Sequence, residues 1–441
     1  MGGAFSVTDT PGYCTHFHYW VWYEGDAERT ADSSGTTVLV NWVQPSITLQ
    51  TPSSVHIGEA VNLEGTLSTS QGPLADTEVT ARVGTPTGWR DLGTLTTDGA
   101  GRFATSDIPQ VAGYHCYQVA YAGDSRNRTA STGRCMSVVK WQTGVSLTTS
   151  GPVQLDEPVV VSGRLASETE ALGGVELQVS RTDTFRGTET LTPVVTAADG
   201  GFTIRDTPPN GGDVTYAVSY AGDETRYAAS RALKVTVYRP ERTLSLTTDR
   251  TVYNYGQTGQ VVVELTTDSL RTVQVYAAEA GRVRTLIFSG DVPETGLTLQ
   301  HLMTRNTTFS ATIAEDGRAL GASASADTTT RAGLTTKALG AYGTSGRYAL
   351  YRPAADPRFA ATLSPARRAT CVWFVLQRRY SDGWRTVGDT PTCVAVGDKS
   401  TATWTLTGKQ ATKTPYRVRP SYPGDGLNAA KTGSWVYFKF V

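Results

Sequence analysis

A short motif recurs along the chain at intervals of about one hundred residues, and this recurrence limits the possible folds more than any other feature. In its full form it reads Tyr-x-Val-x-Tyr-x-Gly-Asp and ends at Asp26, Asp124 and Asp223; a weaker copy ends at Asp425. These aspartates are 98, 99 and 202 residues apart, and the long interval holds a degenerate copy that ends at Asp316. Self-similarity at a fixed period indicates one structural unit copied in tandem.

Within each unit the apolar residues follow the two-residue period of β-strands. Examples are Val159 with Val161, and Tyr216 with Val218 and Tyr220, and clusters of Gly, Asp and Pro separate such runs. No run of ten or more residues has helical periodicity. About 100 residues with seven or so short strands is the size of an immunoglobulin-like sandwich of two sheets. We therefore predict an all-β chain of tandem immunoglobulin-like β-sandwiches in an elongated array.

The repeated signature resembles that of the tandem bacterial Ig-like repeats in secreted proteins of actinobacteria. The small residues at 227–230, the segment 206–216 and the ending at 428–440 strengthen the resemblance, which covers nearly the whole chain. It implies an Ig-like fold and a secreted, extracellular or cell-wall-associated location, and it implies little about activity. In related architectures such repeats often follow another module, so an upstream module of the same polypeptide is an expected partner.

The unit boundaries fall at short linkers, and the first unit is incomplete. Residues 1–45 supply about three strands, which leaves inner-face side chains such as Tyr19 and Tyr23 without an opposing sheet. Half a sandwich is marginally stable by itself, so we expect upstream residues of a longer polypeptide to complete it. The five predicted parts are the C-terminal part of a truncated Ig-like domain at 1–45, Ig-like domains at 46–141 and 142–240, a degenerate Ig-like domain at 241–332, and a basic Ig-like C-terminal domain at 333–441.

Four of the five cysteines form two pairs that flank turns. Cys116 and Cys135 lie on either side of the second Gly-Asp turn, and Cys371 and Cys393 on either side of a turn at Asp382. The parity of the neighbouring apolar residues points both pairs outward, so we predict two disulfides that each cross a single hairpin. Each should contribute roughly 2 to 4 kcal/mol and indicates an oxidising compartment. Free thiols in a cytosolic protein are the alternative.

Cys14 is left over, and it alternates with His16 and His18. Three such side chains on one side of a strand allow soft-metal ligation. No fourth ligand or supporting carboxylate is suggested nearby, so we prefer an outward polar edge strand whose Cys14 pairs with a cysteine of the missing half. We predict no metal and no cofactor.

Charge is distributed unevenly, although the chain as a whole holds 40 basic and 40 acidic residues. Residues 333–441 contain 16 Lys and Arg against 5 Asp and no Glu, a net charge of +11, and the remainder carries −11. Such a domain suits an anionic polysaccharide or another anionic cell-wall polymer, whereas the neutral whole gives no reason to expect nucleic acid. A solvated face that balances the acidic units is the alternative. The candidate binding residues are Arg367, Arg368, Arg378, Arg379 and Arg385.

Three tryptophans at outward positions form a second set of binding candidates. Trp20 and Trp22 alternate with the inward tyrosines of the first unit, and Trp373 lies on another outward-facing position. Exposed tryptophans in a row are unusual on a soluble surface and could stack on sugar rings. The alternative is that they cover a domain junction or the absent half of the first sandwich, because large aromatic side chains are mostly packed.

Neither a catalytic arrangement nor a membrane span is evident. The five histidines have no Ser or Asp constellation around them, and no Gly-rich phosphate loop precedes a helix. The longest apolar run, 371–376, is far shorter than the roughly 20 residues that cross a bilayer. We predict a non-enzymatic secreted or cell-surface stalk or spacer, adhesive through its basic C-terminal domain. The alternative is a carbohydrate or anionic cell-wall polymer binder; a hydrolase is a third and weaker possibility.

Overall fold

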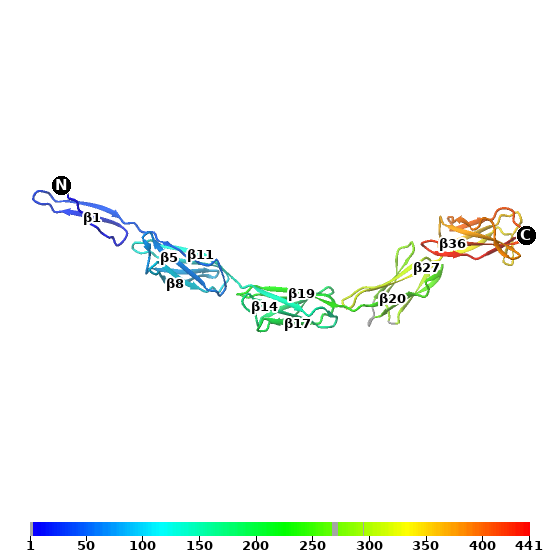
Figure 1. Cartoon of the computed structure of the whole chain (residues 1–441), viewed down its shortest axis with the longest axis horizontal. Coiled ribbons are helices and arrows are strands. Elements are labelled where there is room, and N and C mark those ends of the chain that lie inside the picture. Colours follow the sequence, from blue (N-terminus) through cyan, green and yellow to red (C-terminus); the bar gives the residue numbers. More distant parts are fainter. Residues whose placement is uncertain (1–2, 267–271, 294) are drawn as a thin grey trace. The chain divides into compact units, whose positions relative to one another are not determined.

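The structure, a computed structural model, describes residues 3–266, 272–293 and 295–441. Every regular element in these ranges is a β-strand (Figure 1). The strands form tandem immunoglobulin-like sandwiches, which confirms the predicted all-β fold class. None of the described residues belongs to a helix long and apolar enough to cross a membrane.

The contacts divide the chain into two compact units. Unit 1 comprises Met1–Pro152, Pro158–Thr207 and Asp213–Thr236. Unit 2 comprises Val153–Glu157, Pro208–Gly212 and Val237–Val441. Each is described by itself below.

Residues before the first sandwich form one antiparallel hairpin in which Tyr19 pairs with Thr36 and Val21 with Ser34. The side chains alternate between two faces, as the strand geometry requires. One face carries Tyr19, Val21 and Tyr23, and the other carries tryptophans. Its strands are β1 (His16–Tyr23) and β2 (Asp32–Leu39).

The first sandwich has a five-stranded sheet, β4-β11-β10-β7-β8, and a facing sheet in which β5 pairs with β3, β6 and β9. Val61 and Leu63 of β5 share one core with Tyr117 and Val119 of β10, and each is at most 1% exposed. Burying one such side chain contributes about 1.5 to 3 kcal/mol. The strands are β3 (Ser46–Ile47), β4 (Ser54–His56), β5 (Val61–Thr69), β6 (Gly72–Pro73), β7 (Glu78–Thr85), β8 (Gly88–Thr96), β9 (Arg102–Asp107), β10 (Gly113–Tyr121) and β11 (Ala130–Val139).

A glycine–phenylalanine pair recurs across two strands of the facing sheet. Gly65 of β5 pairs with Phe103 of β9, and a Cβ at Gly65 would lie 2.2 Å from the phenylalanine ring. Gly163 and Phe202 repeat the arrangement in the second sandwich, with a corresponding distance of 2.4 Å. Glycine is required at both positions because the ring occupies the space of a side chain.

The second sandwich repeats this plan with a three-stranded sheet, β12-β14-β17, and a five-stranded sheet, β13-β19-β18-β15-β16. Its strands are β12 (Thr143–Thr149), β13 (Val153–Gln154), β14 (Val159–Ser167), β15 (Glu176–Asp183), β16 (Gly187–Val195), β17 (Gly201–Asp206), β18 (Gly212–Tyr220) and β19 (Ala229–Tyr238).

The third sandwich keeps the plan although its motif is degenerate. A sheet of β20-β22-β25 faces the strands β24-β23-β26-β27, and β21 pairs in parallel with β27. In the strand that carries the degenerate motif, the buried positions hold Phe309, Ala311 and Ile313, where the full motif has Tyr, Val and Tyr. The strands are β20 (Thr243–Thr248), β21 (Val252–Asn254), β22 (Gln257–Thr266), β23 (Thr272–Glu279), β24 (Thr285–Asp291), β25 (Leu297–Met303), β26 (Thr307–Ile313) and β27 (Ala322–Arg331).

The fourth sandwich packs a sheet of β28-β31-β35 against a larger sheet built around β36. A parallel contact between Arg331 of β27 and Ala429 of β37 joins that larger sheet to the third sandwich. The strands are β28 (Gly333–Leu339), β29 (Gly343–Ser345), β30 (Tyr348–Tyr351), β31 (Arg358–Ser364), β32 (Cys371–Tyr380), β33 (Gly383–Thr386), β34 (Thr392–Ala395), β35 (Thr401–Thr405), β36 (Pro415–Gly424), β37 (Ala429–Thr432) and β38 (Val436–Phe440).

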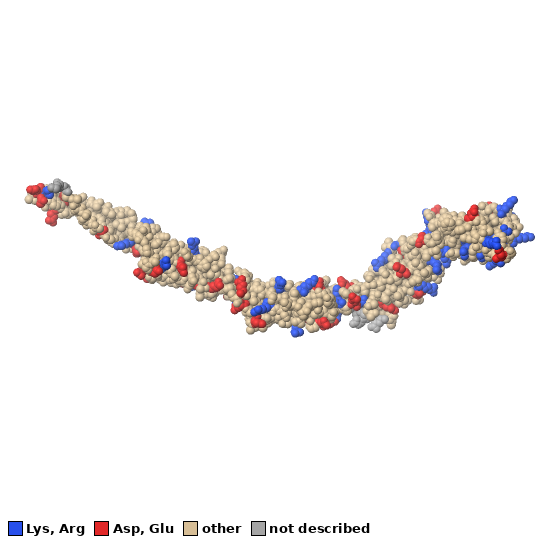
Figure 2. All heavy atoms as spheres, in the orientation of Figure 1, with Lys and Arg blue, Asp and Glu red and all other residues tan. Residues whose placement is uncertain are grey.

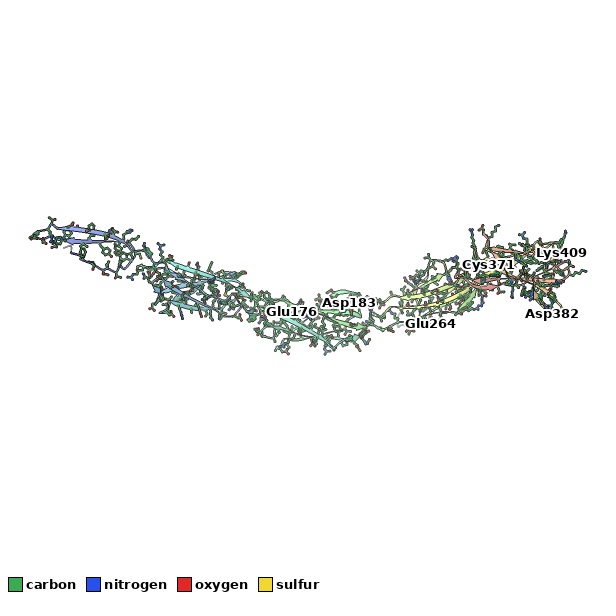
Figure 3. The ribbon with its side chains drawn as sticks, turned by 45° about the horizontal axis from the view of Figure 1, so that its top comes forward. Glu176, Asp183, Glu264, Cys371, Asp382 and Lys409 are labelled. Carbon is green, nitrogen blue, oxygen red and sulfur yellow. A yellow bond between two sulfur atoms is a disulfide. The ribbon has the colours of Figure 1, made fainter. Side chains whose placement is uncertain are left out.

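The two predicted disulfides are present. Cys116 of β10 lies directly opposite Cys135 of β11, and the two are bonded. Cys371 of β32 is bonded to Cys393 of the neighbouring β34. Figure 3 shows Cys371 and Asp382, the turn residue after β32, toward opposite ends of the fourth sandwich.

Candidate functional site

Each Gly-Asp motif forms a tight turn around its aspartate. The Asp124 carboxylate accepts hydrogen bonds from the backbone N–H groups of Arg126 and Asn127 at 2.6 and 2.8 Å. A third comes from the Tyr121 hydroxyl at 2.7 Å. Gly123 has a φ of 83°, a conformation that glycine adopts without steric cost. The turn therefore connects a core side chain to an exposed loop.

These hydrogen bonds, together with burial, shift the pKa values of the aspartate and the tyrosine of the turn. Burial opposes the charge of Asp124, but donors led by the Asn127 amide and the Tyr121 hydroxyl outweigh it and lower the pKa of Asp124 to about 2. Burial, followed by the bond to Asp124, raises the pKa of Tyr121 to about 12. In the second sandwich burial and the bond to Asp223 likewise raise the pKa of Tyr220 to about 12. Both turns hold a charged carboxylate and a neutral phenol.

The turn loop of the first sandwich binds the linker that precedes the sandwich. Val43 forms a parallel bridge with Asn127. The Val43 N–H donates to the Arg126 carbonyl at 3.0 Å, and the Arg128 N–H donates to the Val43 carbonyl at 2.9 Å. We call this contact between a turn loop and the preceding linker or unit a joint.

Trp141 forms the joint between the first and second sandwiches in unit 1. Its backbone N–H donates to Thr225 and its carbonyl accepts from Tyr227, each at 3.0 Å. Its ring stacks on His56 with centroids 4.0 Å apart and planes 9° apart. The indole N–H donates to the Ile57 carbonyl at 3.2 Å. One linker residue thus contacts both sandwiches, the first through its side chain and the second through its backbone.

The degenerate motif forms its joint in unit 2 with a different donor. Ile313 stands where the other copies have tyrosine, and the Arg242 guanidinium donates to the Asp316 carboxylate at 2.6 Å. The Gly211 N–H donates to the Gly317 carbonyl at 2.7 Å. A charged donor from a neighbouring segment therefore replaces the missing phenol.

Asn428 forms the last joint, between the third and fourth sandwiches. It is fully buried, and its side-chain amide donates to the carbonyls of Thr304 and Thr330, each at 3.0 Å. Arg367 donates to Asp425 at 3.0 Å and also binds the Asn428 side-chain oxygen.

This placement corrects the expectation that Arg367 binds a ligand. Its side chain is 8% exposed, and its guanidinium is occupied by Asp425 and Asn428. Arg367 therefore stabilises the last joint instead of facing solvent.

One outward face of the fourth sandwich carries aromatic rings that meet edge to face, with cations lying over them. Strand pairing sets them side by side, since Arg417 lies opposite Tyr437, Tyr348 beside Tyr437, and Arg379 opposite Trp384. We call this set the aromatic–arginine face: Arg347, Tyr348, Arg379, Trp384, Arg417, Arg419, Trp435, Tyr437 and Lys439.

Arg417 is the centre of the aromatic–arginine face. Its guanidinium lies 4.4 Å from the ring centroid of Trp384 and 4.1 Å from that of Trp435. It also donates two hydrogen bonds to the Gln377 side-chain oxygen at 2.9 and 2.6 Å. Arg419 lies 4.4 Å from the Trp435 centroid. Stacking and hydrogen bonds thus fix guanidinium planes that ordinarily sample many rotamers.

The aromatic–arginine face has cations without acidic partners. In the part of the chain that the structure describes, Arg347, Arg379, Arg417 and Arg419 form no ion pair with Asp or Glu. Figure 2 shows Lys and Arg outnumbering acidic residues over the C-terminal part of unit 2. The face therefore offers forked donors for an anionic ligand.

The other predicted arginines have different surroundings. Only Arg379 belongs to the aromatic–arginine face, 5.8 Å from the Trp384 centroid. Arg378 and Arg385 approach the ring of Tyr380, and Arg385 is ion-paired with Asp382. Arg368, whose side chain is 75% exposed, is 3.5 Å from the Asp398 carboxylate. The predicted set does not form one cluster.

The predicted tryptophans lie on outward faces of two separate elements. Trp20 and Trp22 are 74% and 72% exposed on β1. Trp373 is 38% exposed on β32, where it lies opposite Cys393 and Ser421. All three remain accessible to a ligand.

Cys14 lies before β1 and so does not share a strand face with His16 and His18. Its backbone N–H donates to the Ser125 carbonyl at 3.2 Å, and its thiol contacts the Arg126 carbonyl. Thr37 forms a hydrogen bond with the His18 ring. Within the described ranges, no three His, Cys, Asp or Glu side chains are grouped to hold a metal.

Sequence reasoning missed most of the aromatic–arginine face. Arg417 and Arg419 alternate with buried residues of β36, and Trp435, Tyr437 and Lys439 alternate along the end of the chain. That period of two would have placed both sets outward. Their stacking depends on which strands are neighbours, and alternation within one strand carries no information on that.

No family model matches the chain, and no curated protein matches it. Among solved structures, the chain is similar to a tetra-tandem repeat in the extending region of a large adhesion protein, with 15% identity over 90% of this chain and 97% of that one and a TM-score of 0.40. It is also similar to invasin, a bacterial integrin-binding protein, with 13% identity over 90% of this chain and 79% of that one and a TM-score of 0.25. A four-domain fragment of ICAM-5 has 12% identity over 90% of this chain and 100% of that one, with a TM-score of 0.28.

Proposed function

We propose that the chain is a non-enzymatic stalk or spacer, secreted or attached to a cell wall, that projects an upstream module and adheres through its basic C-terminal sandwich. The observation that carries the proposal is the joint, because the repeated turns at Asp124, Asp223, Asp316 and Asp425 each bind the segment before them. A repeat whose most regular motif connects neighbours is suited to spacing. The two disulfides favour an oxidising compartment, and the repeat signature favours the secreted actinobacterial type.

The adhesive part of the proposal rests on the aromatic–arginine face. Guanidinium groups that are already held by Trp384 and Trp435 lose little rotamer freedom when they bind a carboxylate or phosphate. The net charge of +11 attracts a polyanion over a longer range. The ligand class is an anionic polysaccharide or another anionic cell-wall polymer.

Retention on immobilised polygalacturonate, an acidic polysaccharide, tests this function. The full chain should be retained at low salt and released as salt rises. Arg417→Ser with Arg419→Ser should elute at clearly lower salt. A matched pair with the same charge change on the first sandwich, Arg128→Ser with Arg134→Ser, should elute with the unmodified chain.

A lysine variant separates fork geometry from net charge. Arg417→Lys with Arg419→Lys keeps the charge but loses the planar stack, so it should also elute early. If the lysine variant and the unmodified chain elute at the same salt concentration, retention depends on net charge alone and not on the geometry of the guanidinium groups. Equal retention on DNA-cellulose would contradict selectivity for polysaccharide.

A dedicated carbohydrate binder is the second candidate, favoured by the exposure of Trp20, Trp22 and Trp373. In that case a glycan array should give neutral-sugar signals that Trp373→Ala abolishes. A signal that persists after this substitution would count against a carbohydrate site at Trp373 and favour the stalk or spacer function.

A further inference from the structure

The first hairpin and the residues before it match the second half of a complete sandwich in sequence, although residues 3–15 form no strand. Tyr19 donates its hydroxyl to Asp9 at 2.6 Å, as Tyr117 does to Asp107 at 2.9 Å, and in each pair the residues are ten apart. Phe5 precedes Asp9 by four residues, as Phe103 precedes Asp107. Residues 3–39 therefore correspond to β9, β10 and β11.

The corresponding side chains differ sharply in exposure. Val21 and Tyr23 are 41% and 42% exposed, whereas Val119 and Tyr121 are 1% and 5% exposed. Phe5 is 71% exposed, and its counterpart Phe103 is 3% exposed. The same apolar surface is thus buried in one copy and open in the other.

The complete sandwich identifies what covers this surface. In its core, the motif strand β10 packs with apolar residues of two other strands. These are Val61 and Leu63 of β5 and Val79 and Ala81 of β7. Phe103 rests on Gly65, and Phe202 rests on Gly163 in the next copy. A segment that covers Phe5 must present the same pattern, with apolar residues at alternate positions and a glycine opposite the ring.

We propose that residues 3–39 present a docking surface for a polypeptide segment with the strand pattern of residues 46–100, and that this segment completes an Ig-like sandwich. Its central strand has the sequence pattern apolar-x-apolar-x-Gly-x-apolar, as in Val61 to Leu67. The glycine receives the Phe5 ring, and the apolar residues cover Tyr19, Val21 and Tyr23. The tryptophans Trp20 and Trp22 lie on the other face and stay exposed.

A fusion that supplies such a segment from this chain tests the proposal. A second copy of residues 46–100 is joined directly to the N-terminal side of Gly3, the counterpart of Gly101, and the rest of the chain is kept. Amide exchange of residues 16–23 should slow by at least about 100-fold relative to the unmodified chain, as expected for strands inside a folded sandwich. Exchange in the original 46–141 sandwich serves as the internal reference.

Two pairs of variants check that the surface is the intended one. In the fusion, Val21→Asp should abolish the protection and Trp20→Asp should leave it. In the added copy, the equivalent of Gly65→Leu should abolish the protection, because the leucine side chain fills the space that the Phe5 ring needs. The equivalent of Asn62→Leu, at an exposed position, should leave the protection unchanged.

Three results would overturn the proposal. Unchanged exchange in the fusion would show that the pattern does not fit the surface. Equal protection in the fusion with and without Val21→Asp would place the contact elsewhere. A dimeric unmodified chain whose residues 16–23 are already protected would show that a second copy covers this face.

Discussion

Tyr121 acts in two environments at once. Its ring is part of the core of the first sandwich, and its hydroxyl orients the Asp124 carboxylate, whose loop binds the preceding linker. The stability of the core and the geometry of the joint therefore depend on the same side chain. Tyr220 and Asp223 repeat this dependence in the second sandwich.

Replacing Tyr121 by Phe separates the two roles. The ring stays, but Asp124 loses one donor, so the free energy of unfolding of the first sandwich should fall by about 1 kcal/mol. Urea unfolding of the full chain, followed by amide exchange in 46–141, measures the change. Tyr114→Phe is the control because that side chain is 74% exposed; an equal loss in both variants would refute the role of the hydroxyl.

The low pKa of Asp124 makes the joint sensitive to acid. A carboxyl whose pKa falls from 3.8 to about 2 on folding stabilises the native state above pH 3.8, and this contribution is lost as the pH falls toward 2. The thermal midpoint of the first sandwich should therefore drop between pH 4 and pH 2. Asp124→Asn should flatten this part of the profile, and an unchanged slope would contradict the assignment.

At the scale of elements, the disulfides each fasten two adjacent strands. The bonded cysteines are 19 and 22 residues apart in sequence, so each bond closes a short loop that includes one turn. Closing the loop restricts the unfolded chain more than the native sheet, which already holds the strands together.

Reduction should therefore affect only some of the sandwiches. A reducing agent should lower the unfolding free energy of 46–141 and 333–441 by roughly 2 to 4 kcal/mol each. The sandwich at 142–240 contains no cysteine and is an internal control. Amide exchange with and without reductant compares the three in one sample, and an equal loss in all three would point to a general effect of the reagent.

The strands and disulfides were predictable because their signals are local. The period of two around Tyr216 and Val218 reports which face is buried, and Cys116 and Cys135 flank one turn. The burial of Arg367 was not predictable, since it depends on Asp425 and Asn428, which lie 58 and 61 residues later in the sequence. The stacking of Arg417 between Trp384 and Trp435 depends on strand order in the same way.

At the scale of the molecule, the joints make neighbouring sandwiches depend on each other within a unit. Asn428 is the clearest case because its amide, fully buried in the fourth sandwich, is satisfied by carbonyls of the third. Leaving such carbonyls without a donor costs about 1 to 3 kcal/mol.

Asn428→Ala should therefore uncouple the third and fourth sandwiches. In calorimetry of the full chain, a transition that they share should separate into two, because the stabilisation across the joint is lost. Asn62→Ala removes an amide at an exposed position of the first sandwich and should leave the trace unchanged. A single shared transition in the Asn428→Ala protein would show that coupling does not pass through this residue.

The hairpin disulfides also limit how far the chain lengthens under mechanical load. When a sandwich is unfolded by force applied to its ends, the disulfide bypasses the residues between its bonded cysteines. Those residues therefore add no length to the extended chain. With sequence separations of 19 and 22 between the bonded cysteines, the first and fourth sandwiches should release roughly 65 and 75 Å less contour length than their residue counts allow. Each rupture of these two sandwiches would thus lengthen the chain by a shorter step.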